Sequence, residues 1–250
     1  MSALALKIIA CVFMLIDHIG YFWDILPLRI IGRLAFPIFA FMIYNGYCHT
    51  SNKAKYALRI FVFAIATQIP FNLFCYGDLF YNNGNVFFTL LFGLLCIWSV
   101  DVMRKHSVLR WICLLPTVAV CVLMHRGIIV ADYGAAGVLV ILAFYFCDKK
   151  GWVWKIITVL AFLCARYYDV ILAFLEMLYF RLRGMDAPLP TVSSWAQLQI
   201  YSVLALPLIF AYNGKKGTIR GKTGGKVLQY GFYLFYPLHM LLLFIISYFI

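Results

Sequence analysis

The sequence predicts an all-α fold, a polytopic integral membrane helical bundle with about nine transmembrane helices and one interfacial or re-entrant helix. Of its 250 residues, 65% are hydrophobic and 12% are charged, whereas soluble domains contain about 25% charged residues. Apolar runs of about 20 residues, the length that crosses a bilayer, recur along the chain. Only short polar joints separate these runs, so we expect a single membrane domain over residues 1–250.

The predicted spans follow from the apolar runs taken in chain order. Segment 169–182 is also apolar, but its ~14 residues are short for a crossing. A further crossing would also place the Lys-rich loop 213–226 outside, so we predict an interfacial or re-entrant helix there, followed by an extended outer loop over residues 186–190. The spans are expected at about residues 4–23, 28–48, 55–76, 86–103, 108–125, 134–147, 152–168, 196–212 and 228–249.

The positions of Lys and Arg predict the orientation of the bundle. Basic residues gather in the joints at 52–55, 103–106, 148–151 and 213–226, and the positive-inside rule places such joints in the cytoplasm. The joint 77–85 contains no Lys or Arg, as an outer loop should. The N-terminus is therefore predicted to be cytoplasmic. The formal charge of +12 reflects this topology rather than nucleic-acid binding, because the basic residues form no recognition motif.

Most other polar and sulfur-containing residues in the spans are expected to be structural. The eight cysteines fall mostly within apolar runs, without a CxxC motif or a His/Cys cluster at metal-ligand spacing. We therefore expect buried thiols and no metal site. Gln68, Asn72 and Thr89 are isolated polar residues, and these usually form hydrogen bonds between helices.

The adjacent Asp17 and His18, late in the first span, are the strongest functional signal. An ionisable side chain at membrane depth costs about 3 kcal/mol on insertion scales, so such residues are functional-site candidates. Neighbouring residues of a helix point about 100° apart, so one can face a cavity while the other pairs with another helix. The ordinary pKa of histidine suits proton transfer at neutral pH. The alternative is a polar cluster that only holds helices together.

Arg33 in the second span is the expected counter-ion of Asp17. It precedes Pro37, which interrupts the helix at membrane depth, where freed backbone groups must line a cavity or find partners. The joint between the first two spans is short, so these helices should be antiparallel neighbours. Arg29 is expected at the outer interface.

Two more ionisable residues are candidates for the same site. Lys7 lies eleven positions before His18, which is three helical turns and about 16 Å. Lys7 is either a snorkelling anchor at the cytoplasmic edge or part of the site. His239 follows Pro237 in the last span and could face the same cavity as His18, although a structural role is an equal alternative.

Four ordered motifs resemble the TraX family, over nearly the whole chain. The spacing from Lys7 to His18 also resembles the basic-residue-x10-His signature of membrane-bound acyltransferases, with Lys in place of the usual Arg. The FPIF run is similar to the FPxF segment of lysosomal-type heparan glucosaminide acetyltransferases. The four motifs are IDHIG at 16–20, GRLAFPIF at 32–39, NVFFTL at 85–90 and YPLH at 236–239.

The resemblance implies a multi-pass acetyltransferase in a bacterial-type plasma membrane. The TraX family is named after a conjugative-pilus protein that acetylates the N-terminus of pilin. The implied reaction moves an acetyl group from cytoplasmic acetyl-CoA to an amine or hydroxyl of a peptide, glycan or small molecule, without a metal. His18 would be the general base, Asp17 would orient its imidazole, and Arg33 or Lys7 would stabilise the oxyanion. His239 would belong to the same catalytic group.

The basic loop 213–226 is the expected binding segment for the phosphates of CoA. That head group cannot enter hydrocarbon and should stay at the cytoplasmic face. The loop lacks the GxxxxGK[ST] motif of a P-loop, and a purely topological role is an equal alternative. The residues expected to bind acetyl-CoA are Lys7, Lys215, Lys216, Arg220 and Lys222.

Two other functional classes fit the same residues. Proton-coupled transporters also use ionisable residues and broken helices within the membrane, although the chain shows no internal repeat and an odd number of predicted spans. A non-catalytic membrane assembly protein would use the polar cluster as a helix interface. Direct transfer and an acetyl-histidine intermediate are equally compatible with the sequence.

Overall fold

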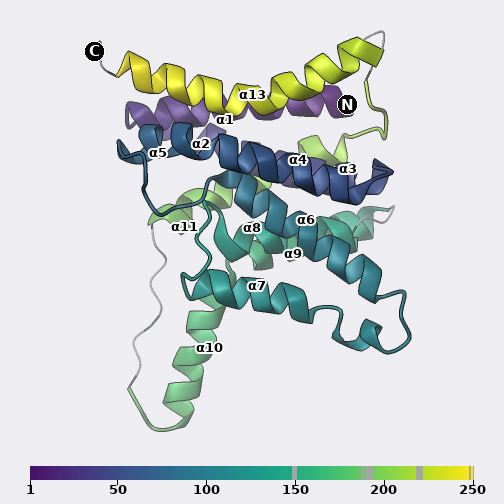
Figure 1. Ribbon diagram of the computed structural model, residues 1–250. Helices are drawn as coiled ribbons and strands as arrows, with labels where there is room; N and C mark the ends of the chain where they lie inside the picture. The colour runs from purple at the N-terminus through teal and green to yellow at the C-terminus, as the bar shows by residue number, and fades with distance from the viewer. Residues whose placement is uncertain (148–150, 187–188, 190–193, 218–221, 248, 250) are drawn as a thin grey trace.

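The described part of the chain is helical, which confirms the predicted all-α class. The computed structural model describes residues 1–147, 151–186, 189, 194–217, 222–247 and 249 (Figure 1). Within these ranges every extended regular element is a helix, and one isolated bridge joins Gly84 to Ala131. The helices are α1 (Ala3–Phe22), α2 (Leu26–Gly32), α3 (Ala35–His49), α4 (Lys53–Ala66), α5 (Gln68–Tyr76), α6 (Val86–Met103), η1 (Leu109–Ile112), α7 (Leu115–His125), α8 (Gly134–Cys147), α9 (Trp152–Arg166), α10 (Tyr168–Leu182), α11 (Ser194–Gln199), η2 (Ile200–Ala205), α12 (Leu206–Phe210) and α13 (Lys222–Ile246).

The apolar helices support the predicted polytopic membrane bundle. Among the described residues three helical segments are long and apolar enough to cross a bilayer, namely α1, Leu26–His49 and α6. The bent pairs α4–α5 and α9–α10 raise this number to 5 if each pair is one span. The remaining predicted spans coincide with described apolar stretches of 10–17 residues, at or below the lower limit for a straight crossing. The last of these stretches belongs to α13, which runs from Lys222 to Ile246.

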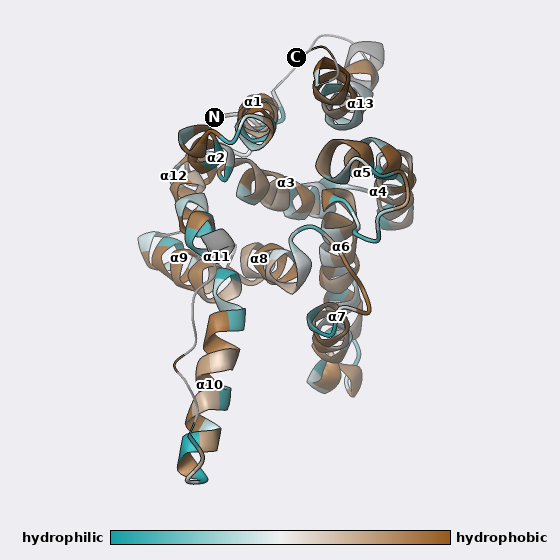
Figure 2. Ribbon diagram, turned by 90° about the vertical axis from the view of Figure 1, so that its left-hand side faces the viewer, coloured by the Kyte–Doolittle hydropathy of each residue, from teal (hydrophilic) through white to brown (hydrophobic). Residues whose placement is uncertain are grey.

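The segment predicted to be interfacial or re-entrant corresponds to α10. The axis of α10 bends by 67° from that of α9, so the chain does change direction before residue 169. Figures 1 and 2 show α10 projecting away from the other helices. Its location relative to a bilayer stays a prediction. Of the extended loop expected after it, residues 187, 188 and 190 lie outside the described part.

Proline positions explain two of the helix breaks, the one between α2 and α3 and the one between α4 and α5. Pro37 has no N–H and its ring would clash with the carbonyl of Arg33, four residues earlier, so α2 ends before Arg33 and α3 begins at Ala35. In the same way, the ring of Pro70 would clash with the carbonyl of Ala66, four residues earlier, and Ala66 is the last residue of α4. The break at Pro37 was expected from the sequence, whereas the break before Pro70 was not, since residues 55–76 were predicted as one span.

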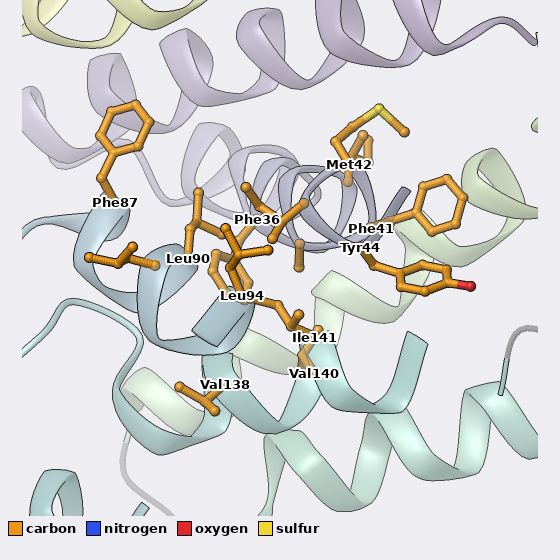
Figure 3. Close-up of a cluster of buried hydrophobic side chains, with 14 of the residues drawn as sticks. Phe36, Phe41, Met42, Tyr44, Phe87, Leu90, Leu94, Val138, Val140 and Ile141 are labelled. Atoms are coloured by element: carbon orange, nitrogen blue, oxygen red, sulfur yellow. The ribbon is translucent and has the colours of Figure 1, made fainter. Parts of the chain in front are cut away.

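The buried core lies where α3, α6 and α8 pack together. Figure 3 shows Phe36, Leu94 and Ile141 among the buried side chains of this region. Gly137 brings α8 close to its neighbours, because a Cβ there would lie 2.4 Å from Thr89 and 2.9 Å from Phe36. Close packing of this kind is the main attraction between helices within a membrane. Helices α1 and α13, from opposite ends of the chain, also lie side by side (Figure 1).

The N-terminus and the start of the basic loop 213–226 lie at the same end of the bundle. The backbone N–H of Ala3 donates to the carbonyl of Lys215 at 2.9 Å, and that of Asn213 donates to the carbonyl of Met1 at 2.9 Å. At this end the joints around 52 and 104 also meet, where Lys53 Nζ lies 3.0 Å from Asp101 Oδ2. The described parts of three joints assigned to the cytoplasm, 52–55, 103–106 and 213–226, are therefore grouped as the predicted topology requires, and residues 148–150 of the fourth lie outside the described part.

Two joints assigned to the outer side meet at the opposite end. The N–H of Gly84 donates to the carbonyl of Val130 at 3.2 Å, and the N–H of Asp132 donates to the carbonyl of Gly84 at 2.8 Å. These bonds clamp the segment 126–133 to the joint 77–85. Which end faces the cytoplasm stays a prediction.

Candidate functional site

Asp17 forms an ionic cluster with two arginines of the second predicted span. Its Oδ2 accepts a hydrogen bond from Arg33 Nη2, and Arg29 Nη1 lies 3.1 Å from the same oxygen. Arg29 also donates to the backbone carbonyl of Asp17 at 3.2 Å. The pairing predicted between Asp17 and Arg33 is therefore present. Arg29, expected only at the interface, is part of the same cluster.

Gly32 allows this cluster to form at the contact between α1 and α2. A Cβ at residue 32 would lie 2.2 Å from the Cβ of Asp17 and 2.5 Å from its Cα. Any larger residue would push the two helices apart, and Arg29 and Arg33 would move with α2. The side chain of Arg33 is only 1% exposed, so its charge depends on Asp17 for compensation.

His18 pairs with His239 rather than with a carboxylate. His18 Nδ1 lies 2.6 Å from His239 Nε2, and the two rings stack with centroids 4.8 Å apart. The expectation that Asp17 orients the imidazole is wrong, because its carboxylate points to α2 while His18 faces α13. Adjacent residues on a helix diverge by about 100°, which separates the two side chains. The expectation that His239 meets His18 agrees with the structure.

The hydrogen bonds of His239 determine which nitrogen of His18 can accept a proton. His239 Nδ1 lies 2.6 Å from the carbonyl oxygen of Phe235. A carbonyl only accepts, so Nδ1 of a neutral His239 carries the hydrogen and its Nε2 is an acceptor. His18 Nδ1 must then donate to that Nε2. The lone pair of a neutral His18 is therefore on Nε2.

Two cavities lie toward opposite ends of the bundle. We call the first the basic cavity; its volume is about 580 Å³, and Lys7, Arg59 and Lys216 are among the residues that line it. We call the second the histidine cavity; its volume is about 290 Å³. Its ionisable lining residues include Asp17, His18, Arg29, Arg33 and Asp132. Four residues line both cavities, so they share one wall: Met14, Phe39, Val86 and Tyr236.

The residues predicted to bind acetyl-CoA are only partly brought together. Lys7 and Lys216 line the basic cavity. Lys215 contributes backbone hydrogen bonds to the N-terminal contact described above. Arg220 lies outside the described residues. Lys222 is the first residue of α13, but its side chain is not among the described ones. Lys7 and His18 line different cavities, so a role of Lys7 in stabilising an oxyanion beside His18 has no support.

Arg59 is a cavity residue that the sequence interpretation missed. Its guanidinium carbon lies 5.4 Å from the ring centroid of Tyr56 and 5.8 Å from that of Tyr233. A charged residue one turn into a predicted span can indicate a functional site. At that position, however, the sequence does not distinguish it from an arginine that lies at the membrane interface near the end of a helix.

Asp132 is a second residue that was missed, and the loop around it is firmly held. Besides the bond from its N–H to Gly84, the N–H of Tyr133 donates to Thr89 Oγ1 at 3.3 Å. The ring of Tyr133 stacks on Phe36 with centroids 3.7 Å apart. Burial raises the pKa of the Asp132 carboxyl to about 6, and the guanidinium of Arg33 opposes this rise. An ionisable carboxyl group is thus presented to the histidine cavity.

Arg166, at the end of α9, lies behind this loop and was also not predicted. Its guanidinium carbon is 5.6 Å from the ring centroid of Tyr133. Its side chain is buried. An arginine at the edge of an apolar run is expected at an interface, so the sequence contained no signal that it packs inward.

The amide residues of the third predicted span are structural, as expected for Gln68 and Asn72. Gln68 Nε2 donates to Asn72 Oδ1 at 2.8 Å, and Asn85 Nδ2 donates to Gln68 Oε1 at 2.9 Å. Asn85 Nδ2 also donates to the carbonyl of Ala64, beside the break before Pro70, at 2.7 Å. This network holds α5 against the start of α6. Among the described residues, no group of three His, Cys, Asp or Glu side chains is arranged to hold a metal ion.

Comparison with known proteins agrees with the motifs. The family model described as TraX protein matches residues 2–247. The chain belongs to the TraX family. A curated relative, named "Probable fimbrial assembly protein FimC, serogroup H1" from Dichelobacter nodosus, is 29% identical over 259 aligned residues, which cover 97% of this chain and 94% of the relative. No solved structure matches. The resemblance inferred from four motifs thus extends along nearly the whole chain.

Proposed function

We propose that this TraX family member is a membrane-embedded acetyltransferase that moves an acetyl group from acetyl-CoA to an amine or hydroxyl acceptor. The observation that carries the proposal is the wall shared by the two cavities. A polyanionic donor and an acceptor can each enter from its own end of the bundle and meet at that wall. His18, a general base by its chemistry, lines the acceptor side.

The basic cavity suits acetyl-CoA in charge and size. Lys7, Arg59 and Lys216 supply positive charge for its phosphates. The volume of about 580 Å³ falls within the range of small-molecule sites, roughly 300–1,000 Å³. The apolar side chains between these residues and the shared wall suit the pantetheine arm. This end would then be cytoplasmic, in agreement with the predicted cytoplasmic N-terminus.

The hydrogen-bond chain from Phe235 through His239 prepares His18 for general-base catalysis. The acceptor attacks the thioester carbonyl carbon while His18 Nε2 takes the proton from its amine or hydroxyl. The C–S bond then breaks, and the proton passes from His18 to the departing CoA sulfur. General-base catalysis of this kind contributes about 10²–10⁴-fold. His239 acts through His18 and is a positioning residue.

The histidine cavity is the proposed acceptor site. Its volume of about 290 Å³ suits the reacting end of a larger molecule, such as a peptide N-terminus or a sugar. The Asp132 carboxylate accepts hydrogen bonds from such a group. The name of the curated relative, a probable fimbrial assembly protein, favours a peptide acceptor of a fimbrial subunit.

The direct test uses the full chain purified in lipid nanodiscs with radiolabelled acetyl-CoA. We expect transfer to an amine or hydroxyl probe, either a tripeptide with a free N-terminus or glucosamine. His18→Ala should abolish transfer while the Kd for acetyl-CoA stays within about twofold. Transfer that is unaffected by this substitution would contradict the mechanism. Mass spectrometry of cells with and without the chain would identify the natural acceptor.

A non-catalytic assembly protein is the second candidate, favoured by the same relative's name. In that case the polar cluster would serve only to hold helices together. Cells that carry His18→Ala in a stably expressed chain separate the two candidates. The assembly role predicts an unchanged phenotype, whereas the enzyme predicts the phenotype of the deletion. A proton-coupled transporter would instead move protons in vesicles without consuming acetyl-CoA.

A further inference from the structure

Tyr236 occupies the wall between the two cavities. It lies on α13, one helical turn before His239, and is 4% exposed. Of the four residues that line both cavities, Met14, Phe39 and Val86 have apolar side chains. Tyr236 is therefore the member of this wall that can donate a side-chain hydrogen bond.

Three aromatic contacts hold the ring of Tyr236 in place. Its centroid lies 6.1 Å from that of His18 and 6.0 Å from that of His239, both in edge-on geometry. The ring of Phe87, on the first turn of α6, lies 5.3 Å away at 86°. The phenol is thus held beside the histidine pair and against the start of α6.

Tyr236 packs against the N-terminus of α6. Val86, the first residue of that helix, lines the same wall as Tyr236, and the next residue, Phe87, contacts its ring. The first N–H groups of a helix have no partner within the helix and carry partial positive charge. A phenol oxygen beside such N–H groups can accept from them, and the phenol's own hydrogen can then be donated to another group at the wall.

Neither Arg33 nor Lys7, the oxyanion donors expected from the sequence, lines both cavities. Arg33 is committed to the ion pair with Asp17, and its side chain is 1% exposed. Of the two cavities, Lys7 lines only the basic cavity. A thioester that reaches from the basic cavity to an acceptor beside His18 must cross the wall at Tyr236.

We propose that Tyr236 is a catalytic residue whose hydroxyl donates a hydrogen bond to the thioester carbonyl oxygen. This inference rests on the proposed acetyl transfer. As the acceptor attacks the carbonyl carbon, the electron pair of the C=O bond moves to oxygen, and the phenol stabilises the resulting oxyanion without losing its proton. When the C–S bond breaks, the C=O bond re-forms. One such donor is worth about 10²–10³-fold in kcat.

The test compares Tyr236→Phe with the full-length chain in nanodiscs, using acetyl-CoA and the same tripeptide and glucosamine probes. The variant keeps the ring and its three contacts. We expect kcat to fall about 10²–10³-fold, with the Kd for acetyl-CoA within about twofold. Tyr230→Phe is the matched control, because Tyr230 lies on the same helix with its side chain exposed, and its kcat should match the unsubstituted chain.

The outcomes separate this inference from the function on which it rests. If the unsubstituted chain transfers acetyl groups and Tyr236→Phe is equally active, the role of Tyr236 is overturned and the proposed function stands. If the unsubstituted chain transfers acetyl to neither probe, both are overturned.

A second variant covers the case in which Tyr236→Phe does not fold. Incorporation of 3,5-difluorotyrosine at position 236 keeps the hydroxyl but makes it more acidic. If the phenol acts as a hydrogen-bond donor, kcat should fall at the alkaline pH at which the fluorinated phenol ionises, because the ionised form has no hydrogen to donate. A pH profile identical to that of the unsubstituted chain would overturn the proposal.

Discussion

The basic cavity and the histidine cavity share a wall but differ in how their charge is balanced. The described residues that line the basic cavity include Lys7, Arg59 and Lys216 and no Asp or Glu. In the histidine cavity, Arg29 Nη1 lies 3.1 Å from Asp17 Oδ2, and Arg33 Nη2 pairs with the same oxygen. A cavity whose described lining residues include basic side chains and no carboxylate suits a ligand that carries its own negative charge. A cavity whose ions are already paired is suited to holding reacting groups in fixed positions.

The first prediction concerns the paired charges of the histidine cavity and has the largest expected effect. Asp17→Asn leaves the buried guanidinium of Arg33 without its carboxylate. Removing one partner of a buried ion pair costs about 3–5 kcal/mol. We therefore expect a marked fall in the unfolding midpoint, measured by thermal unfolding in detergent.

Asp101 supplies the matched control for that prediction. It contacts Lys53 at 3.0 Å and Lys105 at 3.2 Å, with its own side chain 24% exposed. Exposed pairs contribute about 1 kcal/mol or less, so Asp101→Asn should have a small effect. Equal destabilisation by the two substitutions would refute the contrast drawn between buried and exposed pairs.

The second prediction tests the positioning of His18. His239→Phe keeps a ring in the stack but removes the nitrogen that accepts from His18 Nδ1. We expect kcat for acetyl transfer to fall about 10²-fold, less than the full contribution of a general base, which reaches about 10⁴-fold. Affinity for acetyl-CoA, measured by isothermal titration, should hardly change.

The control for His239 is His125→Phe. His125 is exposed and lies 3.5 Å from Asp169, and it lines neither described cavity. This variant should transfer acetyl groups at the normal rate. If the kcat of His239→Phe equals that of the unsubstituted chain, His18 does not need the hydrogen bond with His239 for catalysis.

The third prediction addresses the charge of the basic cavity. Lys7→Gln and Arg59→Gln should each raise the Kd for acetyl-CoA roughly tenfold, equivalent to about 1.4 kcal/mol. The effect should shrink as salt increases, because ions screen charge interactions at exposed sites. Lys55→Gln, on an exposed residue one turn before Arg59, is the control. A similar loss in all three variants would indicate non-specific attraction.

The smallest expected effect is a pH dependence due to Asp132. Because burial raises its pKa from 3.8 to about 6, the carboxyl is mostly protonated at pH 5 and mostly ionised at pH 7. The ionised form accepts hydrogen bonds from the acceptor, so the acceptor KM should decrease a few-fold as pH rises through this range. The charged groups around Asp132 are Asp17, Arg29, Arg33 and Arg166.

Asp132→Asn isolates this effect from the titration of His18. The variant should lose the change in KM between pH 5 and 7, while kcat keeps whatever pH dependence His18 confers. A KM profile that is unchanged in Asp132→Asn would remove Asp132 from the acceptor site.

Local features of the sequence were sufficient for the helices and for one half of the site. Apolar runs located the helical segments, since hydrophobic length and proline positions act locally. The short joint between the first two spans correctly predicted that Arg33 would meet Asp17. The number of crossings stays a prediction, because several of the predicted spans fall on described apolar stretches of 10–17 residues.

The other half of the site depends on contacts between distant segments. The partner of His18 comes from a helix 221 positions away, and motif order could suggest this contact but not its geometry. Tyr236 belongs to the YPLH motif, but nothing local in the sequence gives it a catalytic role, and Asp132 resembles an ordinary loop residue. Their importance follows from the packing of α13 against α1 and from the clamp between residues 84 and 130–132.

The most direct test of the central claim is transfer across the membrane in sealed proteoliposomes. Radiolabelled acetyl-CoA, which cannot cross the bilayer, is added outside, and the tripeptide and glucosamine are trapped inside. We predict that vesicles in which the basic cavity faces outward label a trapped acceptor, and that His18→Ala vesicles do not. Label that appears only when acceptor and acetyl-CoA are on the same side would contradict a reaction at the shared wall of the two cavities.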